Sequence, residues 1–396
     1  MKIGIITGEF PPMQGGVGDF SRELSRALAV LGHDIHILTS CDQSAKAETS
    51  RSYAVHRIVH DWDWNCWGEI CQWVEKQQPD IINIQYQAAA YDMRPAIHLL
   101  PWRLRRLGNA PVVVVTYHDL KLPYLFPKAG PLRQQAVLAL ARWSEAAIVT
   151  NKEDHLTLDR YQSLAPSTFH IPIGSNITVQ PPPGYDRHAW RARYGLAPND
   201  LLLAYFGFLN VSKGGETLIR TLHKLILNHP AEMNVHLLMI GGQVGSSDPT
   251  NEAYLHHIKT LIAKLELDNR VHWSGYTPAQ EVSANLLAAD LCLLPYQDGV
   301  SFRRGSFMAA LIHGRPIIST QPQVPLPELR DGENILLASP GDIDALAAAV
   351  ARLAADPDLR QRLGEGAATL AQQFTWEKIA SRTAKLFAFL KKGGRV

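Results

Sequence analysis

The chain has 396 residues, about twice the usual length of one domain, so it can build two domains with sizeable cores. Hydrophobic residues make up 46% and charged residues 19%, which excludes a disordered or highly charged chain. The 39 basic and 37 acidic residues leave a net charge of +2, and this balance argues against a protein that coats nucleic acid. We therefore expect no nucleic-acid partner, and any phosphate site should be local.

The four cysteines favour a reducing compartment, because they form no CxxC pair and no zinc-ligand spacing with neighbouring histidines. The first residues, MKIGIITGEFPP, are too short for the apolar core of a signal peptide. No run of 18 uncharged apolar residues predicts a transmembrane helix. We expect a cytoplasmic protein, either soluble or peripheral at the inner face of the membrane.

Short runs of Val, Ile and Leu alternate with helical patterns through the first half of the chain. The runs predict buried parallel strands at 3–7, 35–39, 81–84, 112–116 and 147–150. Between the first two, Phe20, Leu24, Leu28 and Leu31 recur at helical spacing, and Gly32 follows as a stop signal. This segment reads as one βαβ unit.

Three consecutive prolines and a glycine at 181–184 interrupt the pattern, and we place a domain boundary there. A second alternation predicts strands at 201–206, 235–240, 271–273, 291–294 and 316–319, with helices after Gly214 and near 254–265. Residues 343–390 are almost wholly helical, with interruptions at Pro357 and near Phe374. The predicted fold is α/β: a Rossmann-like domain over 1–180, a second over 181–374, and a C-terminal helix over 375–396 that returns to the first.

Ligands of such domains bind at the carboxyl ends of the strands, so we expect the functional residues in the loops there. The loop after the first strand contains Gly15, Gly16 and Gly18 before a helix, and its amides suit a sugar diphosphate. A dinucleotide fingerprint and a ligand-free turn are the alternatives; strict GxGxxG is absent, and no acid ends the second strand. His118 and Asp119 follow another strand, where an imidazole can bind a sugar hydroxyl or simply be solvated.

The second domain offers cations in equivalent loops. Asn210, Lys213 and Gly214 lie between a strand and a helix, where a lysine can reach phosphate oxygens or act only as a charge near a helix cap. After a later strand, LLPYQDGVSFRRGS supplies a candidate anion cradle or a set of solvated surface arginines. The candidate residues of that segment are Asp298, Ser301, Arg303, Arg304, Gly305 and Ser306.

These motifs resemble, in order and over essentially the whole chain, those of the family-4 retaining glycosyltransferases of the GT-B fold. The likeness includes the GGV loop, the His-Asp pair, the G-x-L-x-x-x-K-G string at 207–214, LLMIGG, LLPYQDG and PLPELRDGENILLASPGD. The resemblance implies two domains facing a cleft, with a nucleotide-sugar donor bound mainly by the second and the acceptor mainly by the first. It implies that Gly16 faces the donor phosphates, His118 the donor sugar or the acceptor, and Lys213 the diphosphate.

Backbone near Gly242 and Tyr276 would bind the base of the donor nucleotide, and backbone contacts do not distinguish uridine, guanosine and adenosine.

Two departures from the family indicate a divergent subgroup. Phe208 stands where the family usually has an arginine, a loss that Arg303 or Arg304 would offset. The family's two glutamates, eight positions apart, are absent, and Ser301 and Ala309 occupy their register. Asp298 is the alternative group for the sugar, with Ser301 or Ser306 as hydroxyls.

We therefore expect a retaining hexosyltransferase that moves a sugar from a UDP, GDP or ADP sugar to a glycan, lipid-linked or small-molecule acceptor in cell-surface or exopolysaccharide synthesis. His118 and Asp298 are the catalytic candidates, and no metal or cofactor is expected. Asp61-Trp62-Asp63 resembles the metal-binding acid pair of other glycosyltransferases, but its aromatic setting favours a surface or lid. A nucleotide-sugar epimerase and a catalytically silent nucleotide-sugar-binding protein are the alternatives.

One segment of the first domain combines basic and aromatic residues, which suits contact with an anionic membrane. The alternative interpretation is a helix that packs on the core and exposes a basic face to water. The residues concerned are Trp102, Arg103, Arg105, Arg106 and Phe126.

Overall fold

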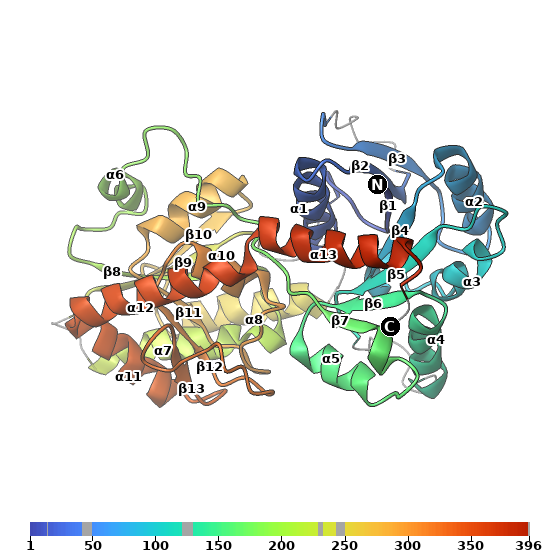
Figure 1. Cartoon of the computed structure of the whole chain (residues 1–396). Helices are drawn as coiled ribbons and strands as arrows, with labels where there is room; N and C mark the ends of the chain where they lie inside the picture. The colour runs from blue at the N-terminus through green and yellow to red at the C-terminus, as the bar shows by residue number, and fades with distance from the viewer. Residues whose placement is uncertain (14, 42–49, 121–129, 229–232, 243–249, 395–396) are drawn as a thin grey trace. The chain divides into compact units, whose positions relative to one another are not determined.

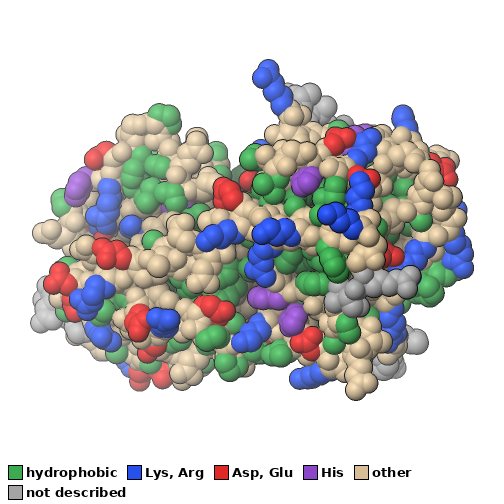
Figure 2. Space-filling view, in the orientation of Figure 1, with side chains coloured by type: hydrophobic (Ala, Val, Ile, Leu, Met, Phe, Trp, Pro, Cys, Tyr) green, Lys and Arg blue, Asp and Glu red, His purple; other side chains and the backbone are tan. Residues whose placement is uncertain are grey.

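The computed structural model describes residues 1–13, 15–41, 50–120, 130–228, 233–242 and 250–394. The chain forms two compact units (Figure 1): unit 1 contains Met1–Gly174 and Thr375–Val396, and unit 2 contains Ser175–Phe374. The polypeptide thus changes unit shortly before the run of prolines where we place the boundary. On the face drawn in Figure 2, acidic and basic side chains are interspersed, as the near-zero net charge leads one to expect.

Unit 1 is built on a parallel sheet with the strand order β3-β2-β1-β4-β5-β6-β7. Strands β2 and β3 follow one another on one side of β1, and β4 to β7 follow one another on the other side. The strands are β1 (Lys2–Thr7), β2 (Asp34–Ser40), β3 (Ala54–Val59), β4 (Ile81–Tyr86), β5 (Val112–Tyr117), β6 (Ala146–Val149) and β7 (Thr168–His170). The central strand β4 is wholly buried, because helices cover both faces of the sheet.

The helices of unit 1 are α1 (Gly16–Val30), α2 (Cys66–Gln77), α3 (Leu100–Leu104), α4 (Gly130–Arg142), α5 (Lys152–Asp159) and α13 (Trp376–Lys391), with 3-10 turns η1 (Ala88–Tyr91), η2 (Ala96–Leu99) and η4 (Ala165–Ser167). The last helix, α13, lies against α1 (Figure 1). Its apolar face, with Ile379, Phe387 and Leu390, joins the core formed by Phe20, Leu24 and neighbouring strand residues. The C-terminal helix therefore contributes core to the unit that begins the chain.

Unit 2 repeats the plan with a parallel sheet in the order β10-β9-β8-β11-β12-β13. Its strands are β8 (Leu201–Phe206), β9 (Val235–Ile240), β10 (Val271–Gly275), β11 (Leu291–Leu294), β12 (Ile317–Thr320) and β13 (Leu336–Ala338). Its helices are α6 (Arg187–Ala192), α7 (Gly215–Asn228), α8 (Thr250–Lys264), α9 (Ala279–Ala288), α10 (Gly305–Ile312), α11 (Ile343–Ala355) and α12 (Pro357–Ala371), with η5 (Val211–Lys213) and η6 (Gln372–Phe374). Strand order reverses between β8 and β11, so the loops after these two strands open beside each other.

The predicted α/β class with two doubly wound sheets is confirmed, and all the predicted strands are present. Three strands were missed: β3, β7 and β13, each at the edge of its sheet. Two of them have only three residues, and β3 is largely half-exposed and includes a histidine and an arginine. β3 and β7 lack the continuous apolar pattern that reveals the other strands, and the apolar run of β13 is too short to stand out from a loop.

A buried ion pair connects α6 to the sheet of unit 2. Arg191, only 2% exposed, donates from Nη1 to Asp290 Oδ2 at 3.1 Å and to Ala288 O at 2.9 Å. The same carboxylate oxygen accepts from the backbone N–H of Leu202 at 2.7 Å, and Arg187 pairs with the other oxygen. Asp290 therefore balances a guanidinium that has almost no access to water.

Asp290→Ala should destabilise unit 2 by about 3–5 kcal/mol, because it leaves the buried Arg191 guanidinium uncompensated. Asp344→Ala is the matched control: Asp344 is 75% exposed and pairs with Lys224, so its loss should cost less than about 1 kcal/mol. Urea denaturation of the full chain measures both. Similar small losses in the two variants would contradict this account.

Candidate functional site

The loops after β8 and β11 are fastened together at the carboxyl edge of the unit 2 sheet. Gln297 donates from its backbone N–H to Ser212 O and from Nε2 to Thr217 Oγ1, both at 2.8 Å. Gly214 has a positive φ of 72°, and a Cβ there would lie 1.9 Å from the Pro295 carbonyl oxygen. Only glycine permits this approach, which brings the start of α7 next to the segment leading into α10.

Lys213 extends across the end of β8 toward α10. A Cβ on Gly207 would lie 3.2 Å from Lys213 Nζ and 3.8 Å from Ser306 Cβ, so these three residues lie together. Burial, reinforced by the positive charge of Arg304, lowers the pKa of the Lys213 ammonium to about 8. Within the part of the chain that the structure describes, no carboxylate pairs with this ammonium.

Two adjacent arginines complete what we call the cation cluster, which is Lys213, Arg303 and Arg304. Both guanidinium groups bind the carboxylate of Asp298: Arg304 Nη2 donates to Oδ1, and Arg303 Nη2 donates to Oδ2 at 3.3 Å. Each arginine side chain is 14% exposed. The cluster and Asp298 together carry three positive charges against one negative charge, an arrangement that attracts a polyvalent anion.

Arg304 is fixed in place but retains unused hydrogen-bonding capacity. Its guanidinium lies over the Tyr296 ring, with Cζ 5.0 Å from the ring centroid, and its buried Nε has no partner among the described residues. The Tyr296 hydroxyl and Ser306 Oγ are 2.6 Å apart, and burial raises the pKa of Tyr296 to about 12. Tyr296 is thus a neutral support for both Arg304 and Ser306, and it was missed by the sequence analysis.

The other candidates of this segment have distinct settings. Gly305 begins α10, and a Cβ there would meet nothing within 4 Å, so its backbone is open to approach. Ser301 is buried, at 4% exposure. Asp298 is held by the two arginines and so helps to position them; its predicted contact with the donor sugar stays a prediction.

Asn210 is used within its own loop. It caps η5 by accepting from the backbone N–H of Lys213 at 3.1 Å, and Ser212 Oγ donates to the same oxygen. Its side chain therefore sets the position of Lys213.

Phe208 forms a wall beside the cluster. Its ring lies against Gly242, where a Cβ would be 2.9 Å from Cε1, and its centroid is 6.0 Å from Lys213 Nζ. Phe208, which stands where the family usually has an arginine, thus supplies an apolar surface.

Tyr276, the other residue predicted near the base, follows β10 and is 71% exposed.

His118 follows β5 in unit 1 and is half-buried. Its Nε2 lies 2.9 Å from Gln85 Oε1, and the Phe20 ring meets it edge-on at 4.6 Å between centroids. Burial lowers the pKa of the imidazole to about 3, so the ring is neutral at physiological pH. Gln85 gave no signal among the sequence motifs, although it is a polar residue in the wholly buried strand β4.

The glycine loop of unit 1 already holds an anion. Glu9 Oε1 accepts from the backbone N–H groups of Val17 at 2.9 Å and Gly18 at 3.2 Å, at the N-terminus of α1. A Cβ on Gly15 would lie 2.1 Å from the Glu9 carboxyl, whereas Gly16 faces open space. Desolvation raises the pKa of Glu9 despite these two bonds. The helix terminus that we assign to donor phosphates is thus occupied by the chain's own carboxylate.

The acid pair beside Trp62 has structural partners. Trp62 is 2% exposed and donates from Nε1 to Ser40 Oγ at 2.9 Å. Asp63 accepts from the backbone N–H of Asn65 at 2.8 Å, while Asp61 pairs with Arg94 at 3.5 Å. In the described ranges, no three His, Cys, Asp or Glu side chains gather in a way that would hold a metal ion.

The basic and aromatic segment near Trp102 is engaged in local contacts. Arg105 binds Glu145 through two nitrogens at 3.0 and 2.7 Å, and the Arg106 guanidinium stacks over Trp102 at 3.5 Å. Arg103 is half-buried, and Phe126 lies outside the described residues. None of the helices in the described ranges has the length and apolarity to span a bilayer.

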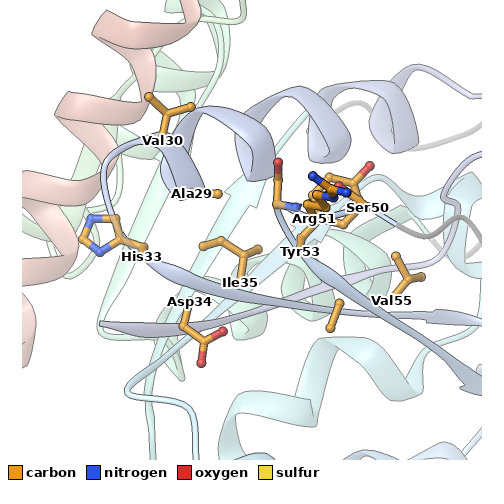
Figure 3. A pocket seen from close by; sticks show the side chains of 11 residues that line it. Ala29, Val30, His33, Asp34, Ile35, Ser50, Arg51, Tyr53 and Val55 are labelled. Carbon is orange, nitrogen blue, oxygen red and sulfur yellow. Dashed lines mark hydrogen bonds between the residues drawn. The ribbon is translucent and has the colours of Figure 1, made fainter.

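A cavity of about 740 Å³ lies elsewhere in unit 1, at the amino ends of β2 and β3. Figure 3 shows that His33, Asp34 and Arg51, which line it, do not converge on one point. It is at the sheet edge opposite the strand carboxyl ends, where ligands of such sheets bind. We therefore do not assign this cavity to the site.

Comparisons with known proteins agree with this geometry. Residues 200–356 match the family model "Glycosyl transferases group 1", and residues 15–168 match "Glycosyl transferase 4-like domain". The chain is a group 1 glycosyltransferase of the family-4 type. Among curated relatives, this glycosyltransferase is 22% identical to the D-inositol 3-phosphate glycosyltransferase of Corynebacterium diphtheriae, over 98% of this chain and 94% of that protein. The glycogen synthase of Mycobacterium tuberculosis is 24% identical, over 100% and 96% of the two chains.

Solved structures show that this glycosyltransferase has the GT-B fold. Sucrose-phosphate synthase from Thermosynechococcus elongatus superposes with a TM-score of 0.77 at 23% identity, covering 99% of this chain and all of that one. Anabaena HepE, solved in complex with UDP and glucose, gives 0.78 at 18% identity, covering 98% and 99%.

Proposed function

We propose that this glycosyltransferase is a retaining hexosyltransferase that uses a nucleoside-diphosphate sugar as its donor. The observation that carries the proposal is the cation cluster at the point where strand order reverses in the unit 2 sheet. A site with excess positive charge at this position suits the diphosphate of an activated sugar. The HepE structures with UDP and with UDP-glucose support a donor of this class.

In the proposed reaction, the acceptor hydroxyl attacks the anomeric carbon from the face that the diphosphate leaves. The bond from the anomeric carbon to the acceptor oxygen forms as the bond to the diphosphate oxygen breaks. The departing diphosphate takes the acceptor proton, so configuration is retained and no side-chain nucleophile is needed.

The protein's part is to stabilise the negative charge that develops on the diphosphate. Lys213 and Arg304 supply cationic hydrogen-bond donors, and the start of α10 adds open backbone. We propose that these groups take the role that a metal ion has in other glycosyltransferases, so that no cofactor is required.

Unit 1 is proposed to bind the acceptor, with His118 contacting a sugar hydroxyl. The names of similar proteins suggest phosphorylated acceptors: one relative acts on D-inositol 3-phosphate, and a trehalose-phosphate synthase from Burkholderia xenovorans, with a TM-score of 0.74, was solved with glucose-6-phosphate. Such small phosphorylated polyols belong in the acceptor screen beside glycans and lipid-linked sugars.

The function is tested by incubating the full chain, in the presence of a chelator, with UDP, GDP and ADP sugars and these acceptors. We expect acceptor-dependent release of one nucleoside diphosphate and a product that keeps the donor's anomeric configuration by NMR. An isomerised sugar nucleotide without diphosphate release would instead indicate an epimerase. Binding without either reaction would indicate a silent nucleotide-sugar-binding protein.

Lys213→Ala and Arg304→Ala should each lower kcat/KM by about 10² or more, because each removes a donor to the developing charge. Lys224→Ala is the control, since this lysine lies on the exposed side of α7 and pairs with Asp344. Steady-state kinetics on the identified donor measure all three variants. Wild-type turnover in both cluster variants would refute the assignment.

Nucleoside diphosphate binding should weaken as pH rises through about 8. Below that value Lys213 is charged and attracts the anion, and above it the free protein loses this charge. Lys213→Arg keeps a charged group throughout, so its dissociation constant should change much less between pH 7.5 and 9.5. Calorimetric titration of both proteins decides the point, and equal pH dependence would exclude Lys213 from the binding site.

A further inference from the structure

A chain of polar side chains crosses the buried centre of the unit 1 sheet. Asn83 and Gln85 on β4 are 0% exposed, and Thr116 on the neighbouring β5 is 2% exposed. Central parallel strands covered on both faces are normally apolar, and buried polar groups are retained when their hydrogen bonds are made. The last side chain in this hydrogen-bonded row is that of His118, just beyond β5.

The direction of each hydrogen bond in this chain follows from a backbone carbonyl. Asn83 Nδ2 lies 3.2 Å from Val114 O, which can only accept, and donates also to Thr116 Oγ1 at 2.9 Å. Asn83 therefore turns its Oδ1 toward Gln85, whose Nε2 donates to it. Gln85 must then present Oε1 to His118.

This order determines the protonation of the imidazole. Gln85 Oε1 is an acceptor, so His118 Nε2, 2.9 Å away, must carry the hydrogen. In a neutral ring the other nitrogen, Nδ1, then bears a lone pair. Nδ1 has no hydrogen-bond partner among the described residues.

We propose that Gln85 is a positioning residue that holds His118 as the Nε2–H tautomer and leaves Nδ1 to accept a hydrogen bond from a hydroxyl of the substrate. This role rests on the proposed function, and it assigns His118 to orientation rather than to acid catalysis. An imidazole that is already neutral has no proton to give at Nδ1. The low pKa of His118 agrees with this role, because the acceptor form persists across the working pH range.

The test uses ¹⁵N-histidine NMR on the full chain, with His118→Gln to assign the resonance. The wild-type protein should show His118 protonated at Nε2 and unprotonated at Nδ1, whether or not a substrate is known. Protonation at Nδ1, or an averaged mixture of tautomers, would overturn the proposal. This readout is independent of transfer activity, so a failure of the proposed function is seen separately in the nucleotide-sugar screen.

Gln85→Met removes the acceptor that keeps the hydrogen on His118 Nε2, so both neutral tautomers should become populated. We expect kcat/KM to fall by about tenfold, which corresponds to the free energy of one hydrogen bond. Gln72→Met, at an exposed position of α2, is the control and should change neither readout. A folded Gln85→Met protein with unchanged His118 resonances and turnover would refute the positioning role. If this variant does not fold, the wild-type spectrum alone decides, because it tests the same tautomer.

Discussion

Unit 2 keeps a surplus of positive charge at the carboxyl edge of its sheet, and the proposed site depends on this charge. Arg303 and Arg304 bind the carboxylate of Asp298 there, and the Lys213 ammonium lies beside Gly207 within the field of Arg304. Removing the Lys213 ammonium from water, next to the positive charge of Arg304, raises the free energy of the folded protein, and the lowered pKa of Lys213 reflects that cost. Binding of an anion would offset this cost. The cluster is therefore better explained by a function in anion binding than by a contribution to stability.

The fold makes this cluster possible through short loops. Gly214 lets the loop after β8 lie against Pro295, and Gln297 binds both Ser212 and Thr217. Asn210 fixes the backbone of Lys213, and Tyr296 lies under Arg304. Neutral polar groups thus hold the cations in place, while Asp298 balances part of their charge.

The sequence predicted the central strands and the loops that follow them, because buried parallel strands are continuous apolar runs. Lys213 and the paired arginines were found by their position after such strands. The edge strands β3, β7 and β13 were not found, because polar residues interrupt the first two and the apolar run of β13 has only three residues. Glu9 was missed as well: nothing local indicates that its carboxylate folds back onto the amides of Val17 and Gly18. The same holds for Asn83 and Gln85, whose partners Thr116 and His118 lie 33 residues further along, at the end of β5 and just after it.

The loops at the carboxyl ends of the strands carry opposite charge in the two units. In unit 2 Arg303 and Arg304 share the carboxylate of Asp298 and the Lys213 ammonium lies nearby, whereas in unit 1 the Glu9 carboxyl fills the helix terminus. This contrast is the reason we propose that the diphosphate binds in unit 2. A crystal structure of the full chain with a nucleoside diphosphate tests that assignment most directly. We expect phosphate oxygens within hydrogen-bond distance of Lys213 Nζ and the Arg304 guanidinium; a fully occupied ligand bound away from both would contradict the proposed site.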